Sequence, residues 1–323
     1  DNDSVVSYLP LCHVAEKIFS LFLPMYIGYT VNFAESIATI QADLSEIAPT
    51  VFLGVPRIWE KLQSSILIKI KDSALLKQWL FRRCLAVGHR TAGLRLNGQR
   101  LSLCMRFFES LAYALMLRAL QNYVGLRKVR FCFSAAAKVS PDVLRFFHDI
   151  GIRVKEGYGM TESTGLSFIH MGDDIRMGTV GRPLSCIEFK INPDGELLKK
   201  GDPIFSGYYK NEAATAETIV DGWVHTGDVA ELSDDGHLTI VDRKKDIIIT
   251  SGGKNIAPSE IENALKVSPY IKEAIVVGEG RNYLAALIQI DFENVGKWAT
   301  DNRIAYTNFK NLTSNQNVYD LIR

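Results

Sequence analysis

The segment of residues 152–163, Ile-Arg-Val-Lys-Glu-Gly-Tyr-Gly-Met-Thr-Glu-Ser, joins a predicted strand to a tyrosine between two glycines. We expect the strand to cover residues 152–155 and to end at Gly157-Tyr158-Gly159. A helix is predicted just before it, because Ser140-Pro141-Asp142 combines a hydroxyl cap, a proline at the first helical position and an acid in the first turn. Ligands of open α/β sheets bind beyond the carboxyl ends of strands. The segment therefore predicts a binding site at residues 157–163.

Two later segments carry residue types that suit a nucleotide. His225-Thr226-Gly227-Asp228 places a carboxylate after a turn glycine, and Asp242-Arg243-Lys244-Lys245-Asp246 is a basic run between two acids. Together the three segments offer an aromatic surface for a nucleobase, one carboxylate for a metal, another for a ribose, and a basic hinge. Each segment alone is unspecific, but the ordered set indicates a protein that handles a nucleotide.

The remaining pattern predicts an α/β fold. Residues 1–54 alternate strand and helix, which is typical of a parallel sheet flanked by helices. Apolar residues then recur at every fourth position in two places: Ile58, Leu62, Ile66 and Ile70, and later Leu103, Phe107, Leu111 and Leu115. Residues 57–123 are therefore expected to be mostly helical, with a break at residues 93–98.

The second half of the chain has a different texture. Short strands and turns follow residue 177, with turns expected at Pro193-Asp194-Gly195 and Asp234-Asp235-Gly236. A smaller unit with strands at residues 246–250, 274–278 and 284–290 and a helix at 258–267 begins at Lys244. We expect a large sheet-and-helix N-terminal domain, residues 1–241, and a smaller α+β C-terminal domain, residues 242–323, with the boundary at Asp242.

Charge is concentrated in one segment although the whole chain has a net charge of only +1. Residues 61–130 hold fourteen Lys or Arg residues against two acids, Asp72 and Glu109. Such a face attracts anions. We expect the basic insert, residues 57–128, to dock reversibly on an anionic membrane surface; the alternative is an ordinary solvated face. No nucleic-acid partner is expected, because aromatic residues are not interleaved with the charges.

Composition also bears on the compartment. The five cysteines are far apart in sequence, which argues against a disulfide framework or a zinc site and favours a reducing environment. The apolar run at residues 18–31 contains Pro24 and Gly28 and is too short to span a bilayer. No secretory leader is recognisable, and the chain enters a strand-like segment at once, as if inside a longer protein. We expect a cytoplasmic protein, peripheral on the cytosolic face of a membrane.

In this order, the motifs resemble the AMP-forming acyl-CoA synthetases of the adenylate-forming superfamily, specifically the long-chain fatty-acid branch. The matching strings are Tyr8-Leu9-Pro10-Leu11-Cys12-His13, Gly54-Val55-Pro56-Arg57-Ile58-Trp59-Glu60-Lys61, residues 157–163, Gly178-Thr179-Val180-Gly181, Phe205-Ser206-Gly207-Tyr208-Tyr209, residues 222–228 and residues 242–262. The resemblance covers almost the whole chain. It implies that both domains are partial: residues 1–241 are the C-terminal portion of a large AMP-binding domain, and residues 242–323 are a truncated lid domain.

The resemblance implies a long-chain fatty acid–CoA ligase. In that family the fatty carboxylate attacks the α-phosphorus of ATP, giving acyl-AMP and pyrophosphate, and coenzyme A then displaces AMP after the small domain rotates. The implied substrates and cofactors are a long-chain fatty acid, ATP or AMP, Mg²⁺ and coenzyme A.

The resemblance also assigns roles to single residues. Thr161 would hydrogen-bond a phosphate, Glu162 would hold Mg²⁺, and His13 would line the acyl or thiol site unless it is a satisfied core histidine. Asp242 matches the hinge. The residues matched to the nucleotide and coenzyme A are Ala136, Ala137, Gly157, Tyr158, Gly159, Asp228, Arg243, Gly252 and Gly253. Lys138 replaces a proline usual in the family, and Trp59 is either core packing or a gate of the acyl channel.

Two catalytic features of the family are not found in residues 1–323: the Ser/Thr/Gly-rich phosphate loop and the late catalytic lysine. The lysines nearest in position lie too early to match, namely Lys266, Lys272, Lys297 and Lys310. Because such donors are each worth several kcal/mol, we expect this chain alone to be nearly inactive. Two alternatives therefore stay open: a non-catalytic nucleotide- or acyl-binding fragment or pseudoenzyme, and an aryl-CoA or peptide-synthetase type of adenylating relative.

Overall fold

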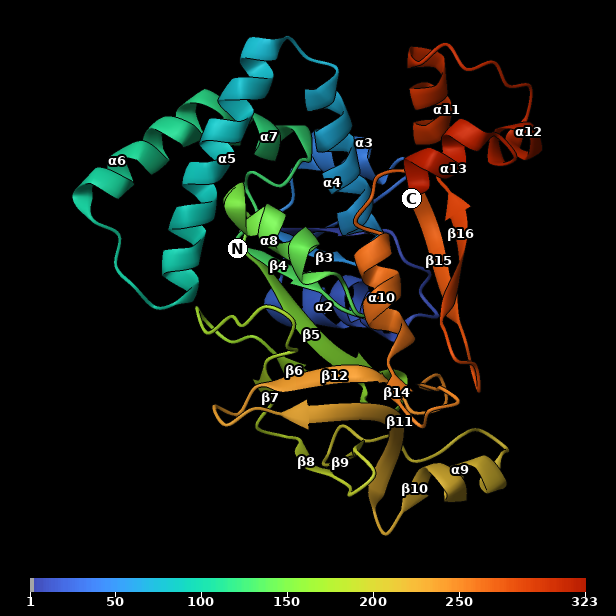
Figure 1. Ribbon diagram of the computed structural model, residues 1–323. Coiled ribbons are helices and arrows are strands. Elements are labelled where there is room, and N and C mark those ends of the chain that lie inside the picture. The colour runs from blue at the N-terminus through green and yellow to red at the C-terminus, as the bar shows by residue number, and fades with distance from the viewer. Residues whose placement is uncertain (1–2) are drawn as a thin grey trace. The chain divides into compact units, whose positions relative to one another are not determined.

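The computed structural model describes residues 3–323 and divides the chain into two compact units, which meet between Val241 and Asp242 (Figure 1). The first unit contains a seven-stranded sheet with helices around it and a second, antiparallel sheet. The second unit contains two small antiparallel pairs of strands and four helices among the described residues. The predicted α/β class is confirmed.

The seven-stranded sheet has the order β2-β1-β3-β4-β5-β6-β7. Its strands are β1 (Ser4–Ser7), β2 (Thr30–Phe33), β3 (Val51–Gly54), β4 (Phe131–Ser134), β5 (Val154–Met160), β6 (Gly165–Ile169) and β7 (Arg182–Pro183). Pairing is parallel from β2 to β5 and antiparallel from β5 to β7. The N-terminal part of this sheet is the parallel sheet that the alternation of strand and helix predicted.

Helices connect the parallel strands, as that topology requires. Between β1 and β3 lie α1 (Val14–Lys17), a π-helical turn (Ile18–Phe22), α2 (Leu23–Ile27) and α3 (Ile40–Ile47). Before β5 comes α8 (Pro141–Asp149), which begins where the sequence predicted, because the Ser140 side chain accepts from the Asp142 amide. Gly151, with a φ of 87°, follows its end.

The predicted helical stretch between β3 and β4 is confirmed. It consists of α4 (Pro56–Lys71), α5 (Leu75–Leu96), α6 (Leu103–Ala112), a π-helical turn (Tyr113–Leu117) and α7 (Arg118–Tyr123). The break begins later than predicted, since α5 continues through Gly93 and ends at Leu96. Gly98 then adopts a left-handed φ of 68°, which reverses the chain toward α6.

Trp59, in α4, belongs to the core. Its side chain is fully buried, its Nε1 donates to the Gly54 carbonyl at 3.0 Å, and its ring packs edge-on against Phe52 and Phe147. A Cβ on Gly54 would lie 2.6 Å from the Trp59 ring, so the glycine is required for this packing. Of the two roles considered for Trp59, core packing is therefore the one that the structure gives it.

The antiparallel sheet has the order β10-β11-β9-β8, with β12 also paired to β11. These strands are β8 (Glu188–Ile191), β9 (Glu196–Lys200), β10 (Ile219–Val220), β11 (Trp223–Leu232) and β12 (Leu238–Arg243), and α9 (Glu212–Thr218) precedes β10. The two turns predicted at residues 193–195 and 234–236 close the β8–β9 and β11–β12 hairpins.

The second unit follows the predicted order with small shifts in bounds. It contains β13 (Ile248–Ile249), β14 (Asn255–Ile256), α10 (Pro258–Leu265), β15 (Ile271–Val277), β16 (Ala285–Ile290), α11 (Phe292–Asp301), α12 (Phe309–Thr313) and α13 (Gln316–Ile322). Val295, Ala299, Leu312 and Val318 form its core with Ile290. Within residues 3–323, no helix has both the length and the apolar character needed to cross a membrane.

Candidate functional site

Strand β5 changes partner halfway along its length. Its first residues pair in parallel with β4, and Gly157 to Met160 pair antiparallel with β6 (Figure 1). The prediction that the strand ends at Gly157-Tyr158-Gly159 was therefore wrong: the segment continues the strand, because β6 returns alongside it. A Cβ on Gly159 would lie 1.7 Å from the Gly165 carbonyl oxygen. Only glycine permits this close approach of the two strands.

Tyr158 and Asp228 are in contact although they lie on different sheets. The Tyr158 hydroxyl donates to Asp228 Oδ2, and the Asp228 side chain is largely buried. In β11 the pairing register shifts between His225 and Val229, and the Asp228 amide donates to Thr226 Oγ1 at 3.1 Å. Such a bulge re-aims a side chain. Two of the three predicted segments are thus brought together.

Glu162 and Thr161 lie in a 3₁₀ turn, Thr161–Ser163, directly after β5. Glu162 Oε1 accepts from the Tyr208 hydroxyl at 2.8 Å, and its carbonyl accepts from the Phe205 amide at 2.9 Å. Thr161 is exposed. The segment Phe205 to Tyr209, which was matched by resemblance alone, therefore lies against the predicted site.

Lys199 is a buried residue of this region that sequence reasoning missed. It lies on β9, has no exposed surface, and donates through Nζ to Ser163 Oγ at 2.9 Å and to Ser167 Oγ at 3.2 Å. The Lys199-Lys200 pair gave no sign of which lysine faces inward. Lys199 pairs with the buried Val224 on β11, and this pairing indicates that Lys199 faces inward. The pairing can be known only once the sheet is known.

Polar groups also surround the end of β4, near the two alanines that the resemblance matches to the nucleotide. Ala136 and Ala137 are exposed, and Ala136 has a φ of 78°, which is uncommon for a non-glycine residue. Burial raises the pKa of neighbouring Glu156 to about 8, opposed by a hydrogen bond from the Gly178 amide and by the charge of Lys138. The replacement of proline by Lys138 thus adds a charge beside a buried carboxyl group.

The other predicted residues have local contacts. His13 is the N-cap of α1, where its Nδ1 accepts from the Ala15 amide at 3.2 Å. Asp242 accepts from the Ser259 amide at 3.0 Å and so caps the start of α10. Arg243 is exposed. Gly252 and Gly253 form the exposed turn between β13 and β14. Their roles toward ligands stay predictions.

No cluster of three or more His, Cys, Asp or Glu side chains suited to a metal ion occurs among residues 3–323. Mg²⁺ does not require one, because it is usually held by one or two carboxylates together with substrate phosphates and water. Glu162, a partly exposed carboxylate beside the exposed Thr161 hydroxyl, fits that donor set.

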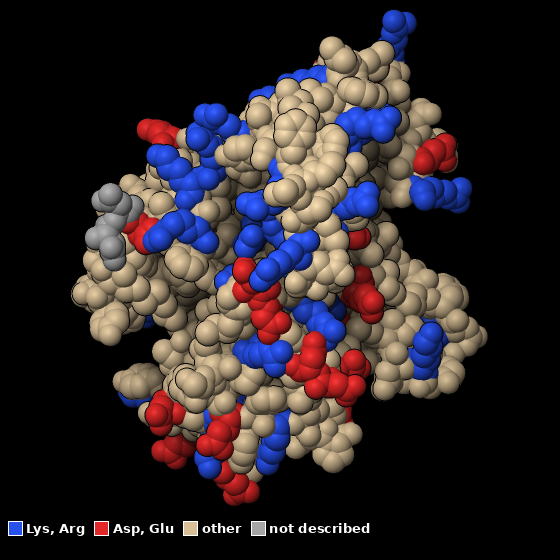
Figure 2. Space-filling model, turned by 90° about the vertical axis from the view of Figure 1, so that its left-hand side faces the viewer, with Lys and Arg blue, Asp and Glu red and all other residues tan. Residues whose placement is uncertain are grey.

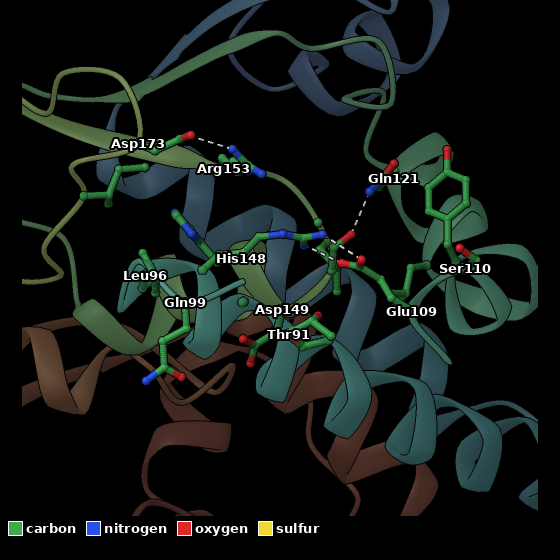
Figure 3. Close-up of a pocket in the computed structure, with 18 of the residues that line it drawn as sticks. Thr91, Leu96, Gln99, Glu109, Ser110, Gln121, His148, Asp149, Arg153 and Asp173 are labelled. Atoms are coloured by element: carbon green, nitrogen blue, oxygen red, sulfur yellow. Dashed lines mark hydrogen bonds and ion pairs between the residues drawn. The ribbon is translucent and has the colours of Figure 1, made fainter. Parts of the chain in front are cut away.

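A pocket of about 700 Å³ lies elsewhere, between α5, the turn after α6 and the end of α8 (Figure 3). Gln121 donates to the Ile150 carbonyl at one side, and the Arg153–Asp173 ion pair lies at the other. Arg153 precedes β5, whereas Gly157 and Tyr158 lie toward the strand's far end. The pocket is therefore separate from the predicted nucleotide segment, and none of the predicted site residues lines it.

Residues 1–209 match the AMP-binding enzyme family, and residues 245–308 match the AMP-binding enzyme C-terminal domain. The putative fatty-acid--CoA ligase fadD11 of Mycobacterium tuberculosis is 36% identical over 301 residues, which cover 92% of this chain and 53% of fadD11. The long-chain-fatty-acid--CoA ligase ACSBG2 of Gallus gallus is 36% identical over 90% of this chain and 39% of its own length. The chain thus spans about half the length of these curated relatives or less.

Solved structures of adenylating enzymes have the same fold. The adenylation domain of a carboxylate reductase from Mycobacterium chelonae superposes with a TM-score of 0.70 at 23% identity, covering 94% of this chain and 44% of that one. The corresponding domain from Segniliparus rugosus, solved with AMP and a co-purified carboxylic acid, gives 0.65 at 25% identity over 92% of this chain and 43% of that one.

Proposed function

The chain belongs to the family of AMP-binding enzymes, and from this premise we propose that it takes part in ATP-dependent activation of a long-chain fatty acid to acyl-AMP and then to acyl-CoA. Both curated relatives quoted above are fatty-acid--CoA ligases. They favour a fatty substrate over the aryl-CoA and peptide-synthetase alternatives. The two structural units correspond in this proposal to the end of the large AMP-binding domain and to part of its lid.

The observation that carries the proposal is the contact between Tyr158 and Asp228 beside the Thr161–Ser163 turn. It sets an aromatic ring, a carboxylate and a candidate metal ligand within one region. An aromatic ring offers a stacking face to adenine, and a carboxylate accepts from both hydroxyls of a ribose. This combination supports nucleotide binding more directly than any of the residues alone.

In the proposed first half-reaction, an oxygen of the fatty carboxylate attacks the α-phosphorus and the bond to the β-phosphate oxygen breaks, so that pyrophosphate leaves. Tyr158 and Asp228 hold the adenosine, and Thr161 donates to a phosphate oxygen. Glu162 would hold Mg²⁺, which when bound neutralises charge on the phosphates. Ala136 and Ala137 border adenine. Gly157 and Gly159 have no side chains, so the nucleotide can approach the backbone of the strand closely.

In the proposed second half-reaction, the thiol of coenzyme A attacks the acyl carbonyl and AMP leaves. Asp242 is the proposed hinge, Arg243 approaches the ribose, and the Gly252–Gly253 turn borders pantetheine. His13 is proposed to line the acyl or thiol site. The capping bond from the Ser259 amide to Asp242 supports a hinge that is rigidly joined to the lid, since a turn of Asp242 carries α10 with it.

Nucleotide binding is tested by calorimetric titration of the chain with AMP, which needs no catalysis. We expect AMP to bind, and Asp228→Ala to weaken binding at least about tenfold through loss of a charge-assisted hydrogen bond. Asp234→Ala, in the exposed β11–β12 turn, is the matched control and should bind like the wild type. Equal affinity of the Asp228 and Asp234 variants would contradict the proposed site.

The substrate class is tested with non-hydrolysable acyl-adenylate analogues of increasing chain length. A long apolar site strengthens binding by about 0.8 kcal/mol for each methylene that it buries. Affinity should therefore rise steadily with chain length and exceed that of a benzoyl analogue. Tighter binding of the benzoyl analogue would favour an aryl-CoA relative. The expectation that residues 1–323 alone release little pyrophosphate stays a prediction.

We further propose a cytoplasmic protein that contacts anionic membrane through the outer side of its helical insert. Several exposed cations lie there: Arg82, Arg83, Arg90, Arg100, Arg106 and Arg118. Arg95 Nη2 donates to Glu109 Oε2 at 2.6 Å, so this acid is paired and the insert offers little negative charge. Figure 2 shows Lys and Arg over the upper part of this face, where α5 and α6 lie, and most Asp and Glu below.

Exposed apolar side chains lie in the same helices as these cations, including Leu75, Leu76, Trp79, Leu103, Phe107 and Leu111. Two of them are aromatic, contrary to the sequence interpretation that aromatic residues are not interleaved with the charges, but most are leucines. Cations beside exposed aromatic and leucine side chains suit an interfacial helix, whose apolar face enters the lipid boundary while its cations meet anionic headgroups. Each well-placed cation contributes about 1 kcal/mol. This complementarity favours an anionic lipid surface over other partners.

Sedimentation with phosphatidylserine-containing vesicles tests this contact. The chain should pellet with these vesicles and far less with phosphatidylcholine alone or at high salt. Phe107→Ser should weaken pelleting, whereas Leu287→Ser, a similarly exposed residue of β16, should not. Pelleting that is unaffected by salt and by Phe107→Ser would contradict the proposal.

A further inference from the structure

Lys199 places a positive charge beneath the candidate nucleotide segment. Lysine is rarely buried unless it is paired, because an ammonium group loses its hydration there. Lys199 is nevertheless fully buried at the centre of the antiparallel sheet, opposite Phe189 on β8 and Val224 on β11. The hydrogen-bond partners of its Nζ are two neutral hydroxyl groups, those of Ser163 and Ser167.

The groups that contact the ammonium group either belong to the candidate site or are hydrogen-bonded to it. Ser163 is the last residue of the turn that carries Thr161 and Glu162, and its hydroxyl also receives a hydrogen bond from Ser167 at 2.9 Å. The Nζ atom lies 4.9 Å from the centre of the Tyr158 ring, within the range of a cation–π contact. Through Tyr158 it is linked to Asp228. Lys199 thus supports both the turn and the aromatic ring.

Two charged groups act on the ammonium from the elements packed around β9. They are Asp228 on β11 and Glu162 in the turn after β5. Burial lowers the pKa of Lys199 to about 8, and the two carboxylates oppose that change. Lys199 is therefore mostly charged at neutral pH.

We propose that Lys199 is a positioning residue of the nucleotide site, which holds the Tyr158 ring and the Thr161–Ser163 turn in the orientation that receives the adenosine. The inference rests on the proposed function, because it assumes that adenosine binds at Tyr158 and Asp228. A cation behind the ring also withdraws electron density from it, which strengthens stacking of an electron-rich base on the opposite face.

The test compares AMP and adenosine binding by calorimetry for the wild-type chain and three variants. Lys199→Met removes the charge at similar volume, Lys199→Arg keeps it, and Lys200→Met changes the adjacent, exposed lysine. We expect Lys199→Met to weaken AMP and adenosine binding alike, by about tenfold. Lys200→Met should leave both affinities unchanged, and Lys199→Arg should restore most of the binding.

The pH profile separates a positioning charge from mere packing. Between about pH 7 and 9.5 the phosphate of AMP stays mostly doubly ionised, so its own titration interferes little. Wild-type affinity should fall as Lys199 loses its proton. The Lys199→Met profile should be flat, and Lys199→Arg should hold its affinity through the same range because arginine stays charged.

Several results would overturn the inference. These are unchanged binding by Lys199→Met, a loss confined to AMP and absent for adenosine, or a wild-type profile without a step that Lys199→Arg removes. If Lys199→Met does not fold, the wild-type and Lys199→Arg profiles still decide. Failure of the proposed function itself looks different, because then neither AMP nor adenosine binds the wild type, or Asp228→Ala has no effect.

Discussion

Helices α4 and α6 carry the same apolar spacing but lie in opposite environments. In α4 the spaced residues are buried: Ile58, Leu62, Ile66 and Ile70 are 1–7% exposed. In α6 and the turn that follows, the equivalent residues are open to solvent: Leu103 is 82% exposed, Phe107 66%, Leu111 44% and Leu115 52%. Spacing therefore predicts that a segment is helical, but it does not predict what covers the apolar side.

The packing partners explain the contrast. Helix α4 packs on α8, where Trp59 meets Phe147 with ring centres 5.0 Å apart. Helix α6 contacts α5, and Ala112 is its one buried residue. The inner side of the insert is thus closely packed, whereas the apolar side chains on its outer side are not covered by other described residues. A membrane contact would use this arrangement.

Leu62→Ala should have the largest effect on stability. Leu62 is buried in α4, so the substitution leaves a cavity and should lower the free energy of unfolding by about 3 kcal/mol. Urea unfolding followed by circular dichroism measures this. Leu103→Ala in α6 is the matched control and should change stability by less than about 0.5 kcal/mol. Similar losses in both variants would remove the distinction between the two helices.

Buried and exposed positions should also differ for ionisable side chains, and Glu156→Gln tests the buried case. Burial raises the pKa of Glu156 from 4.5 to about 8, so its protonated form stabilises the fold below pH 4.5. That contribution is lost as the pH rises toward 8, because the unfolded chain releases the proton first. Above pH 8 the glutamine variant should therefore be more stable than the wild type, and near pH 4 the two should be equal.

A second acid supplies the control for this titration. Glu109 lies in α6 and is paired with Arg95 near the surface. Glu109→Gln should change the free energy of unfolding by no more than about 0.5 kcal/mol at either pH value. Denaturant unfolding at several pH values measures both variants. A Glu156→Gln difference that does not change with pH would show that this carboxyl group ionises normally in the folded protein.

Local signals allowed much of the fold to be predicted. The Ser140 cap, the turn glycines Gly195 and Gly236 and the spacing in α4 and α6 each act within a few residues, and each element formed as expected. The break in the insert came later because Gly93 fits within α5. Short-range chemistry sets such features, so the sequence alone is sufficient for them.

Features that depend on distant partners could not be predicted. Strand β5 continues through Gly159 because β6 returns beside it. Tyr158 meets Asp228 because the pairing register of β11 shifts between His225 and Val229. Lys199 faces inward and Lys200 outward because of their pairing register, and one residue of slip would exchange them. The segments of the site were found from their residue types and from the resemblance, whereas their contacts required the structure.

The ion pair between α5 and α6 should contribute less than either buried residue. Arg95 binds Glu109 through two hydrogen bonds, and the arginine side chain is partly exposed. Arg95→Gln should therefore lower the free energy of unfolding by only about 0.5 kcal/mol. A loss comparable with that of Leu62→Ala would mean that α6 is held by this pair as firmly as α4 is held by its core.

The smallest effect on stability is expected for Phe107→Ser, the variant that should weaken vesicle binding. Because Phe107 is 66% exposed, its replacement removes little buried apolar area and should change the free energy of unfolding by less than about 0.5 kcal/mol. Urea unfolding without lipid measures this. If the variant loses vesicle binding at unchanged stability, the aromatic side chain acts at the lipid surface. If it unfolds more easily, Phe107 is packed in solution, and α6 would resemble α4 after all.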